Sequence, residues 1–196
     1  MNELEKYLDE YLSFYTPDHS RAARALSARF GSLGAISSAS EKELQAVDGV
    51  DATVVHALKL AAYLYGRSVV DSYKLPCTVG EEQIKQLLLA IYSGVSCESV
   101  YCLLFDKRNR LAAIEFLGDG ISNYSEIYPR RVLDAATAVR AEALIIAHNH
   151  PHGVAEPSVA DLNGTLRLKS VLCGAGIRFL GHYIVADTVC EKIKDI

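Results

Sequence analysis

A short apolar run at residues 144–147 leads directly into two histidines, His148 and His150, that are two residues apart. Consecutive apolar residues of this kind are typical of a buried strand, in which successive side chains point to opposite faces. Residues two apart share a face, so both imidazoles are expected on the same side where the strand ends. This feature predicts a buried strand with a polar site at its end.

The chain on both sides of this run alternates between patterns typical of strands and of helices. Runs rich in Val, Ile, Tyr, Phe and Leu predict strands, and a turn at residues 106–109 joins the first two. Pro129, Gly174 and Gly176 are typical of helix starts and ends. These patterns predict a mixed α/β domain over residues 73–196. Its strands are expected at residues 98–105, 111–117, 144–147 and 177–185, the last being the final strand, and its helices at residues 81–91, 129–142 and 157–173.

Residues 1–72 predict a separate, small helical domain, because apolar residues recur there at helical spacing. Gly31 is expected to stop one helix, and Ser40 with Glu43 forms a capping box that starts another. Residues 73–80 break the helical pattern, so the domain boundary is placed there. The helices are expected at residues 4–12, 18–30, 41–47 and 52–67.

The composition suits a folded protein of one or two small domains, since 50% of the 196 residues are hydrophobic and 22% are charged. The five cysteines form no C-x-x-C pair, which indicates reduced thiols of a cytoplasmic protein. No apolar run reaches the roughly 18 residues that cross a bilayer. The acidic N-terminus also does not resemble a secretory signal. No association with membranes is therefore expected.

The segment that follows the two histidines adds a carboxylate. Pro157 and Ser158 are expected to open a helix whose first turn contains Asp161. Two imidazoles and one carboxylate, with a fourth coordination position left open, are typical of catalytic rather than structural zinc sites. Zinc in such a site lowers the pKa of its bound water to about 7. His148, His150 and Asp161 are therefore predicted to be zinc ligands.

The spacing H-x-H, seven residues, Ser, two residues, Asp resembles the signature of the JAMM (MPN+) metalloproteases. The residues from His148 to Asp161 are most similar to the bacterial RadC family, and the similarity extends to residues 98–109, 128–130 and 182–185. This resemblance implies an MPN/JAB domain of cytidine-deaminase-like fold and a zinc cofactor. It also implies hydrolysis of a peptide or isopeptide bond, in a substrate that the sequence does not name, and suggests a homodimer.

The resemblance assigns roles to two further residues. Glu98 would be the general base that takes a proton from the zinc-bound water, and Ser158 would donate a hydrogen bond to the developing oxyanion. Each residue has a simpler alternative. Ser158 stands three residues before Asp161 at a helix start, where it would serve as an N-cap, and the two roles are compatible. Glu98 would otherwise be a solvated carboxylate at the end of a strand.

Three positions depart from the pattern of the RadC family. His152 stands where the family usually has Ser, and is a solvent-facing loop residue, a proton shuttle or an inhibitory ligand in the open coordination position. Gly181 replaces an acidic residue before His182, which weakens the expectation that this strand supports the metal ligands. Arg131 replaces a usual Glu at the start of a helix.

Residues 40–67 resemble a helix-hairpin-helix, a motif that binds nucleic-acid phosphate through backbone N–H groups of a Gly-x-Gly hairpin. Here Gly49 is followed by Asp51 in place of the second Gly, and an Asp caps a helix well but repels phosphate. The first 72 residues also carry seven Lys and Arg against ten Asp and Glu. These features predict a degenerate hairpin, with nucleic-acid binding disfavoured rather than excluded.

Three functions fit the sequence. The first is a zinc-dependent hydrolase of peptide or isopeptide bonds. The second is a DNA-associated protein of repair or recombination that acts through the helical domain, and the third is a catalytically silent scaffold. The intact zinc motif favours the first over the third, and the acidic balance disfavours the second. Other metal chemistries fail on spacing, since the sequence has no H-E-x-x-H and neither of the two zinc-deaminase motifs.

Overall fold

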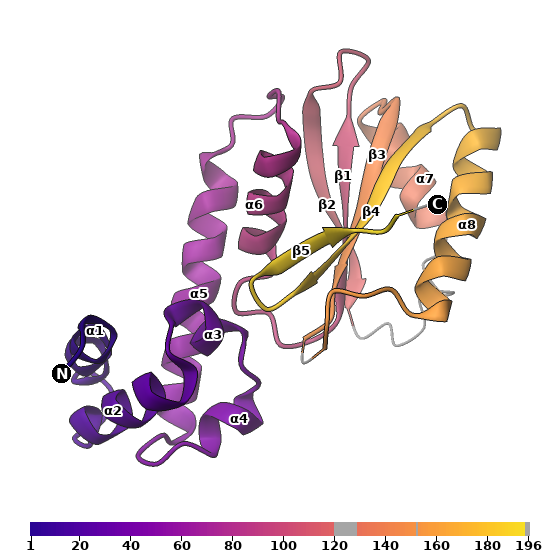
Figure 1. The fold of residues 1–196 in the computed structure, drawn as a ribbon. Helices are drawn as coiled ribbons and strands as arrows, with labels where there is room; N and C mark the ends of the chain where they lie inside the picture. Colours follow the sequence, from indigo (N-terminus) through magenta and orange to yellow (C-terminus); the bar gives the residue numbers. More distant parts are fainter. Residues whose placement is uncertain (120–128, 152, 195–196) are drawn as a thin grey trace.

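The structure is a computed structural model that describes residues 1–119, 129–151 and 153–194. A group of helices at the N-terminus is followed by a five-stranded mixed sheet with helices on both faces (Figure 1). The predicted mixed α/β fold is thus confirmed. The elements are α1 (Glu3–Leu12), α2 (His19–Phe30), α3 (Leu33–Ser38), α4 (Glu41–Gln45), α5 (Ala52–Ser72), α6 (Glu81–Ile91), β1 (Ser99–Phe105), β2 (Leu111–Asp119), α7 (Pro129–Ala138), β3 (Ala143–Asn149), α8 (Val159–Gly174), β4 (Arg178–Ala186) and β5 (Val189–Lys192).

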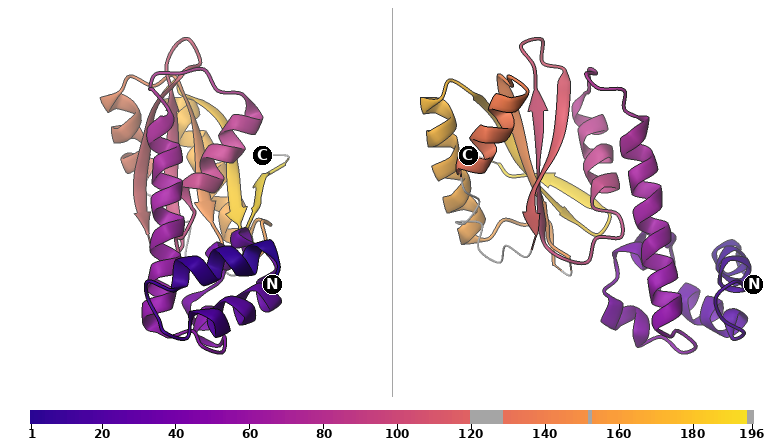
Figure 2. Two further views of the ribbon diagram at one scale, coloured as in Figure 1. Left: turned by 90° about the vertical axis from the view of Figure 1, so that its left-hand side faces the viewer. Right: turned by 180° about the vertical axis from the view of Figure 1, so that it is seen from behind.

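The sheet has the strand order β2-β1-β3-β4-β5. Strands β3 and β4 pair in parallel, and the other neighbouring strands are antiparallel. Helices α5 and α6 lie on one side of the sheet and α7 and α8 on the other (Figures 1 and 2). Strand β3 is buried at every residue, as its unbroken apolar sequence predicts for a central strand covered on both faces.

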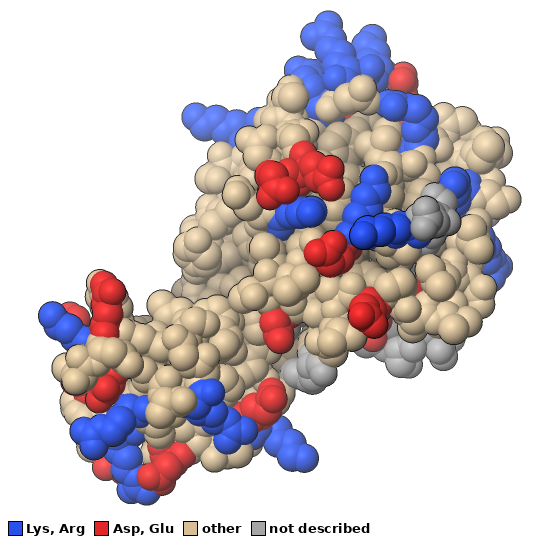
Figure 3. Space-filling model, viewed as in Figure 1, with Lys and Arg blue, Asp and Glu red and all other residues tan. Residues whose placement is uncertain are grey.

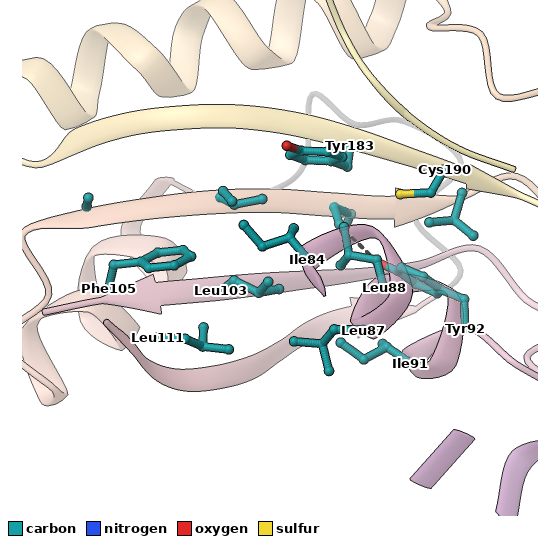
Figure 4. Packing of buried hydrophobic residues seen from close by; sticks show 14 residues of the cluster. Ile84, Leu87, Leu88, Ile91, Tyr92, Leu103, Phe105, Leu111, Tyr183 and Cys190 are labelled. Carbon is teal, nitrogen blue, oxygen red and sulfur yellow. Dashed lines mark hydrogen bonds between the residues drawn. The ribbon is translucent and has the colours of Figure 1, made fainter. Parts of the chain in front are cut away.

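Two apolar cores lie on the two faces of the sheet, because successive residues of each strand point to opposite sides. Ala143, Ile145 and Ala147 of β3 face α6, whereas Leu144 and Ile146 face α7 and α8. Figure 4 shows how the side chains of α6 fit against the first face. Burying one large apolar side chain stabilises the fold by roughly 1.5–3 kcal/mol. By the same alternation, the side chain of His148 lies on the face of the sheet that is covered by α7 and α8.

The N-terminal helices enclose a third core, built from the residues that recur at helical spacing. Leu8 and Leu12 of α1 are buried there against Leu26 and Leu44. The capping box of Ser40 is present, and Gly31 ends α2 with the left-handed φ of 72° that favours glycine. Both predicted helix boundaries are therefore confirmed.

Four elements differ most from the prediction. Helix α3, capped by Ser32, was not predicted because six residues are too few for a helical period to be recognised. Helix α5 continues to Ser72, five residues beyond the expected end. Helix α7 stops at Ala138 because Arg140 takes a left-handed φ of 53°. Strand β4 is not the final strand, since a turn at Asp187, with φ 52°, leads into β5.

Helix α5, which is 21 residues long, connects the N-terminal helices with the sheet. A Cβ atom added at Gly66 would overlap the carbonyl oxygen of Ala90 in α6, so the two helices meet backbone to backbone. Val70 and Tyr73 pack against the core that faces α6. The domain boundary at residues 73–80 stays a prediction. Neither α5 nor any other helix in the described ranges is long and apolar enough to cross a membrane.

Candidate metal centre

Strand β3 places His148 and His150 side by side at its C-terminal end. His148 is paired in the sheet with Val100 of β1 and Ile184 of β4, and the N–H of His150 donates to the carbonyl of Val185 at 2.8 Å. The Nε2 atoms of the two imidazoles lie 2.8 Å apart, so both rings face one point, as their spacing predicts. The side chain of His148 is fully buried, whereas that of His150 is 21% exposed. The site therefore has a buried wall and an accessible side.

Asp161 reaches the two imidazoles from the first turn of α8. Its Oδ1 lies 3.4 Å from Nε2 of His148, and its Oδ2 lies 3.6 Å from Nε2 of His150. Burial by itself would raise the pKa of Asp161, but the nearby imidazoles of His150 and His148 and the hydrogen bonds from Ser158 lower this pKa below its usual range. An ionised carboxylate thus stands beside both rings, and the structure brings the three predicted ligands together.

Glu98 lies immediately before β1 and belongs to the same cluster. One ligand atom from each of Glu98, His148 and His150 lies within 4.8 Å of the others, so these three residues could also hold a metal ion. Burial raises the pKa of Glu98, an effect that His150 opposes and Asp161 reinforces. A carboxylate of raised pKa at the edge of such a site is suited to proton transfer.

Each imidazole is held through the ring nitrogen that points away from the site. Nδ1 of His150 lies 2.9 Å from the carbonyl oxygen of Val154. Nδ1 of His148 lies 2.7 Å from Nε2 of His182 in β4, whose own Nδ1 lies 2.7 Å from the hydroxyl of Thr165 in α8. Burial lowers the pKa of His148 to about 4, against the opposing effect of Asp161, and lowers the pKa of His182 still more clearly. Both buried rings are therefore neutral.

This supporting role of His182 was not predicted, and the expectation drawn from Gly181 was wrong. Residues 181 and 182 point to opposite faces of β4, so the side chain absent at 181 would not face His148. A Cβ at Gly181 would instead overlap the side chain of Lys192. Thr165 lies one helical turn after Asp161, and this spacing was the only local sign of a polar residue beside the ligands. His182 could be placed only once the pairing of β3 with β4 was known.

Ser158 is the N-cap of α8. Its Oγ donates to Oδ2 of Asp161 at 2.6 Å and accepts from the N–H of Asp161 at 3.1 Å, while its own N–H donates to the same Oδ2 at 2.8 Å. This capping box is the simpler of the two predicted roles, and it fixes the carboxylate beside the imidazoles. The side chain of Ser158 is exposed, so it also borders the open side of the site.

The remaining departures from the RadC pattern fall in different places. His152 lies outside the described residues, and its three predicted alternatives stay open. Arg131 donates a hydrogen bond of 2.5 Å to the carbonyl oxygen of Leu117, which ties the start of α7 to β2. Arg131 thus joins two elements of the scaffold.

The donor set suits zinc on chemical grounds. Two imidazoles and a carboxylate are the ligands that zinc takes in catalytic sites. The hydrogen bonds at Nδ1 of His148 and His150 are the outer contacts that typically orient such ligands. Oδ1 of Asp161 faces His148, while Oδ2 is engaged by Ser158, so Oδ1 is the oxygen best placed to bind a cation.

The fold and this site define an α/β domain of the JAB type with a candidate metal centre. The profile of the RadC-like JAB domain matches residues 79–192, and the chain belongs to this family. It is similar to proteins named UPF0758 from several bacteria. A protein of Herminiimonas arsenicoxydans is 33% identical over 83% of this chain and 73% of its own length. One from Nitrosococcus oceani is 38% identical, over 84% and 74%, and one from Vibrio parahaemolyticus is 36% identical, over 81% and 71%.

Proposed function

We propose that this chain is a zinc-dependent hydrolase of peptide or isopeptide bonds. The observation that carries the proposal is the arrangement of two imidazole Nε2 atoms, 2.8 Å apart, against the carboxylate of Asp161. Side chains of this chemistry are gathered largely away from water only at a cost, because their polar atoms must give up hydration. A bound zinc ion would offset that cost, and membership of the RadC-like JAB family supports the same conclusion.

Zinc held by His148, His150 and Asp161 would act as a Lewis acid and lower the pKa of its water. Glu98 would then take the proton of that water and pass it to the leaving amine. Its half-buried position within 4.8 Å of both histidines and its raised pKa both suit this task. Glu98 stands in the role of base in this proposal, while Asp161 completes the ligand set.

Ser158 would donate a hydrogen bond to the oxyanion that forms on the substrate carbonyl. Its single hydroxyl proton is directed to Oδ2 of Asp161, so this role requires the hydroxyl to turn toward the substrate. The N–H of Ser158 keeps its own hydrogen bond to Oδ2 when the hydroxyl turns. Asp161 would therefore stay in place during the step.

Metal content is the direct test. We expect about one zinc per chain in protein purified without added metal, and its loss in His150→Ala. His56→Ala, at an exposed position of α5, is the matched control and should keep its zinc. Zinc-loaded wild type should also cleave members of a set of quenched peptide and isopeptide substrates, and chelation should abolish the cleavage. Wild-type protein that neither contains nor takes up zinc would refute the proposal.

The helical part gives little support to the DNA-associated alternative. The carboxylate of Asp51 accepts a hydrogen bond of 2.9 Å from the N–H of Val54, so it occupies the helix end where a phosphate would bind. Asp48 at the same hairpin pairs with Arg21. On the face in Figure 3, basic and acidic side chains are interspersed over the N-terminal helices. These features favour the hydrolase over a phosphate-binding hairpin.

A further inference from the structure

We infer that Thr165 and His182 are positioning residues that set the tautomer of His148 and so direct an unprotonated nitrogen at the metal centre. The inference rests on the proposed zinc site. It adds that zinc binding requires two residues besides the predicted ligands. Thr165, His182 and His148 are each at most 1% exposed, so water cannot readily take the place of any of them.

The direction of the hydrogen bonds is decided at Thr165. Its Oγ lies 2.5 Å from the carbonyl oxygen of Asp161, which can only accept, so the single hydroxyl proton belongs to this bond. The same Oγ lies 2.7 Å from Nδ1 of His182 and must accept there. His182 therefore carries its proton on Nδ1.

The proton position on His182 then sets the direction of its hydrogen bond with His148. With its proton on Nδ1, His182 offers a lone pair at Nε2, which lies 2.7 Å from Nδ1 of His148. His148 must donate in this bond, so its proton is on Nδ1 and its Nε2 carries the lone pair. That Nε2 faces Asp161 and accepts in the 2.8 Å contact with Nε2 of His150, the ring whose pKa Asp161 raises. One hydroxyl thus decides, through two imidazoles, which nitrogen of His148 can bind a cation.

The two histidine ligands differ in this respect. His150 places its Nδ1 against the backbone carbonyl of Val154, so the backbone keeps a proton on this nitrogen. His148 depends on the side chains of His182 and Thr165. Without the Thr165 hydroxyl both rings can reverse together: His182 then donates from Nε2, and the proton of His148 moves to its own Nε2. Each ring keeps one proton, but the metal-facing nitrogen of His148 is blocked.

Thr165→Val is the variant that tests the inference, since valine keeps the shape of threonine and removes the hydroxyl. Long-range ¹H–¹⁵N spectra of histidine-labelled, metal-free protein report which ring nitrogen is protonated. We expect Nδ1–H at His148 in wild type and in Thr165→Ser, and Nε2–H in Thr165→Val. Competition with a chromophoric chelator should show zinc affinity weakened by about 10-fold to 100-fold in Thr165→Val. Thr165→Ser should stay within a few-fold of wild type.

Thr137→Val is the matched control. The hydroxyl of Thr137 donates to the carbonyl of Leu133 at 2.7 Å, the same contact across one turn that Thr165 makes, but in α7 and exposed. It should change neither the tautomer nor zinc affinity. An unchanged tautomer and affinity in Thr165→Val would overturn the inference, as would a loss in Thr165→Ser equal to that in Thr165→Val.

A second pair of variants keeps the inference testable if Thr165→Val does not fold. His182→Gln retains a side-chain oxygen that can accept from Nδ1 of His148, whereas His182→Leu cannot. Zinc affinity near that of wild type in the first and at least tenfold weaker in the second supports the inference, and equal affinities overturn it. The tautomer is measured without metal. Failure of wild type to bind zinc would therefore count against the proposed function alone.

Discussion

The hydroxyl of Tyr92 donates a hydrogen bond of 2.7 Å to the carbonyl oxygen of Ala147, the residue before His148 (Figure 4). This buried contact joins the end of α6 to the strand that carries His148 and His150. Tyr92→Phe should lower the free energy of unfolding by about 1 kcal/mol, the usual net value of one hydrogen bond. Urea unfolding checks this value, with the exposed Tyr65→Phe as the control that should lose nothing. An unchanged free energy in Tyr92→Phe would contradict it.

Glu98→Gln separates a base from a ligand. If Glu98 moves protons, the amide variant should bind about one zinc per chain and lose hydrolysis by roughly 10²-fold to 10⁴-fold. If Glu98 instead binds the ion, zinc itself should be lost. Metal content and turnover measured on the same preparation distinguish the two. Glu115→Gln, in the edge strand β2, should affect neither quantity.

Ser158 and Ser40 cap different helices with the same hydrogen-bonded box, which allows the cap to be separated from catalysis. Ser40→Ala and Ser158→Ala should each lower the free energy of unfolding by about 1 kcal/mol. Only Ser158→Ala should also reduce turnover, by about 10²-fold to 10³-fold if its hydroxyl serves the oxyanion. Ser158→Asn should recover the stability but not the turnover. Full activity in Ser158→Asn would limit this residue to its capping role.

The exposed cysteines should react with thiol reagents before the buried ones. Burial raises the pKa of Cys190 to about 12, and it also raises the pKa of Cys102. A pKa above the solution pH favours the thiol, so at pH 8 only roughly one Cys190 side chain in 10⁴ is a reactive thiolate. Iodoacetamide should therefore modify the exposed Cys97 and Cys173 first, as followed by mass spectrometry. All five cysteines should react in urea, and early labelling of Cys190 in the folded protein would contradict the prediction.

The local signals in the sequence predicted much of the fold. The apolar run before His148, the capping box at Ser40 and the glycine at position 31 each act within a few residues, so the sequence alone carries them. The sequence did not predict the elements whose form depends on contacts between distant residues. Strand β5 has one buried residue, Cys190, and is defined by its pairing with β4.

The same division between local and distant contacts holds at the candidate metal centre. The strand period and a helix start placed His148, His150 and Asp161 together because each signal is local. His148 and His182 lie in β3 and β4, which are neighbours in the sheet but are separated in the sequence by α8. No spacing in the sequence therefore indicates their contact. The distance of Glu98 from the histidines likewise depends on the pairing of β1 with β3.

The close approach at Gly66 has a mechanical consequence. Since α5 touches α6 backbone to backbone there, no compressible side chain lies between the two helices to absorb a displacement. A load applied to the N-terminal helices would pass along the rigid rod of α5 into α6. From there it would reach, through the hydroxyl of Tyr92, the strand that holds His148. The contacts at Gly66 and Tyr92 therefore form one continuous path from the N-terminal helices to the candidate metal centre.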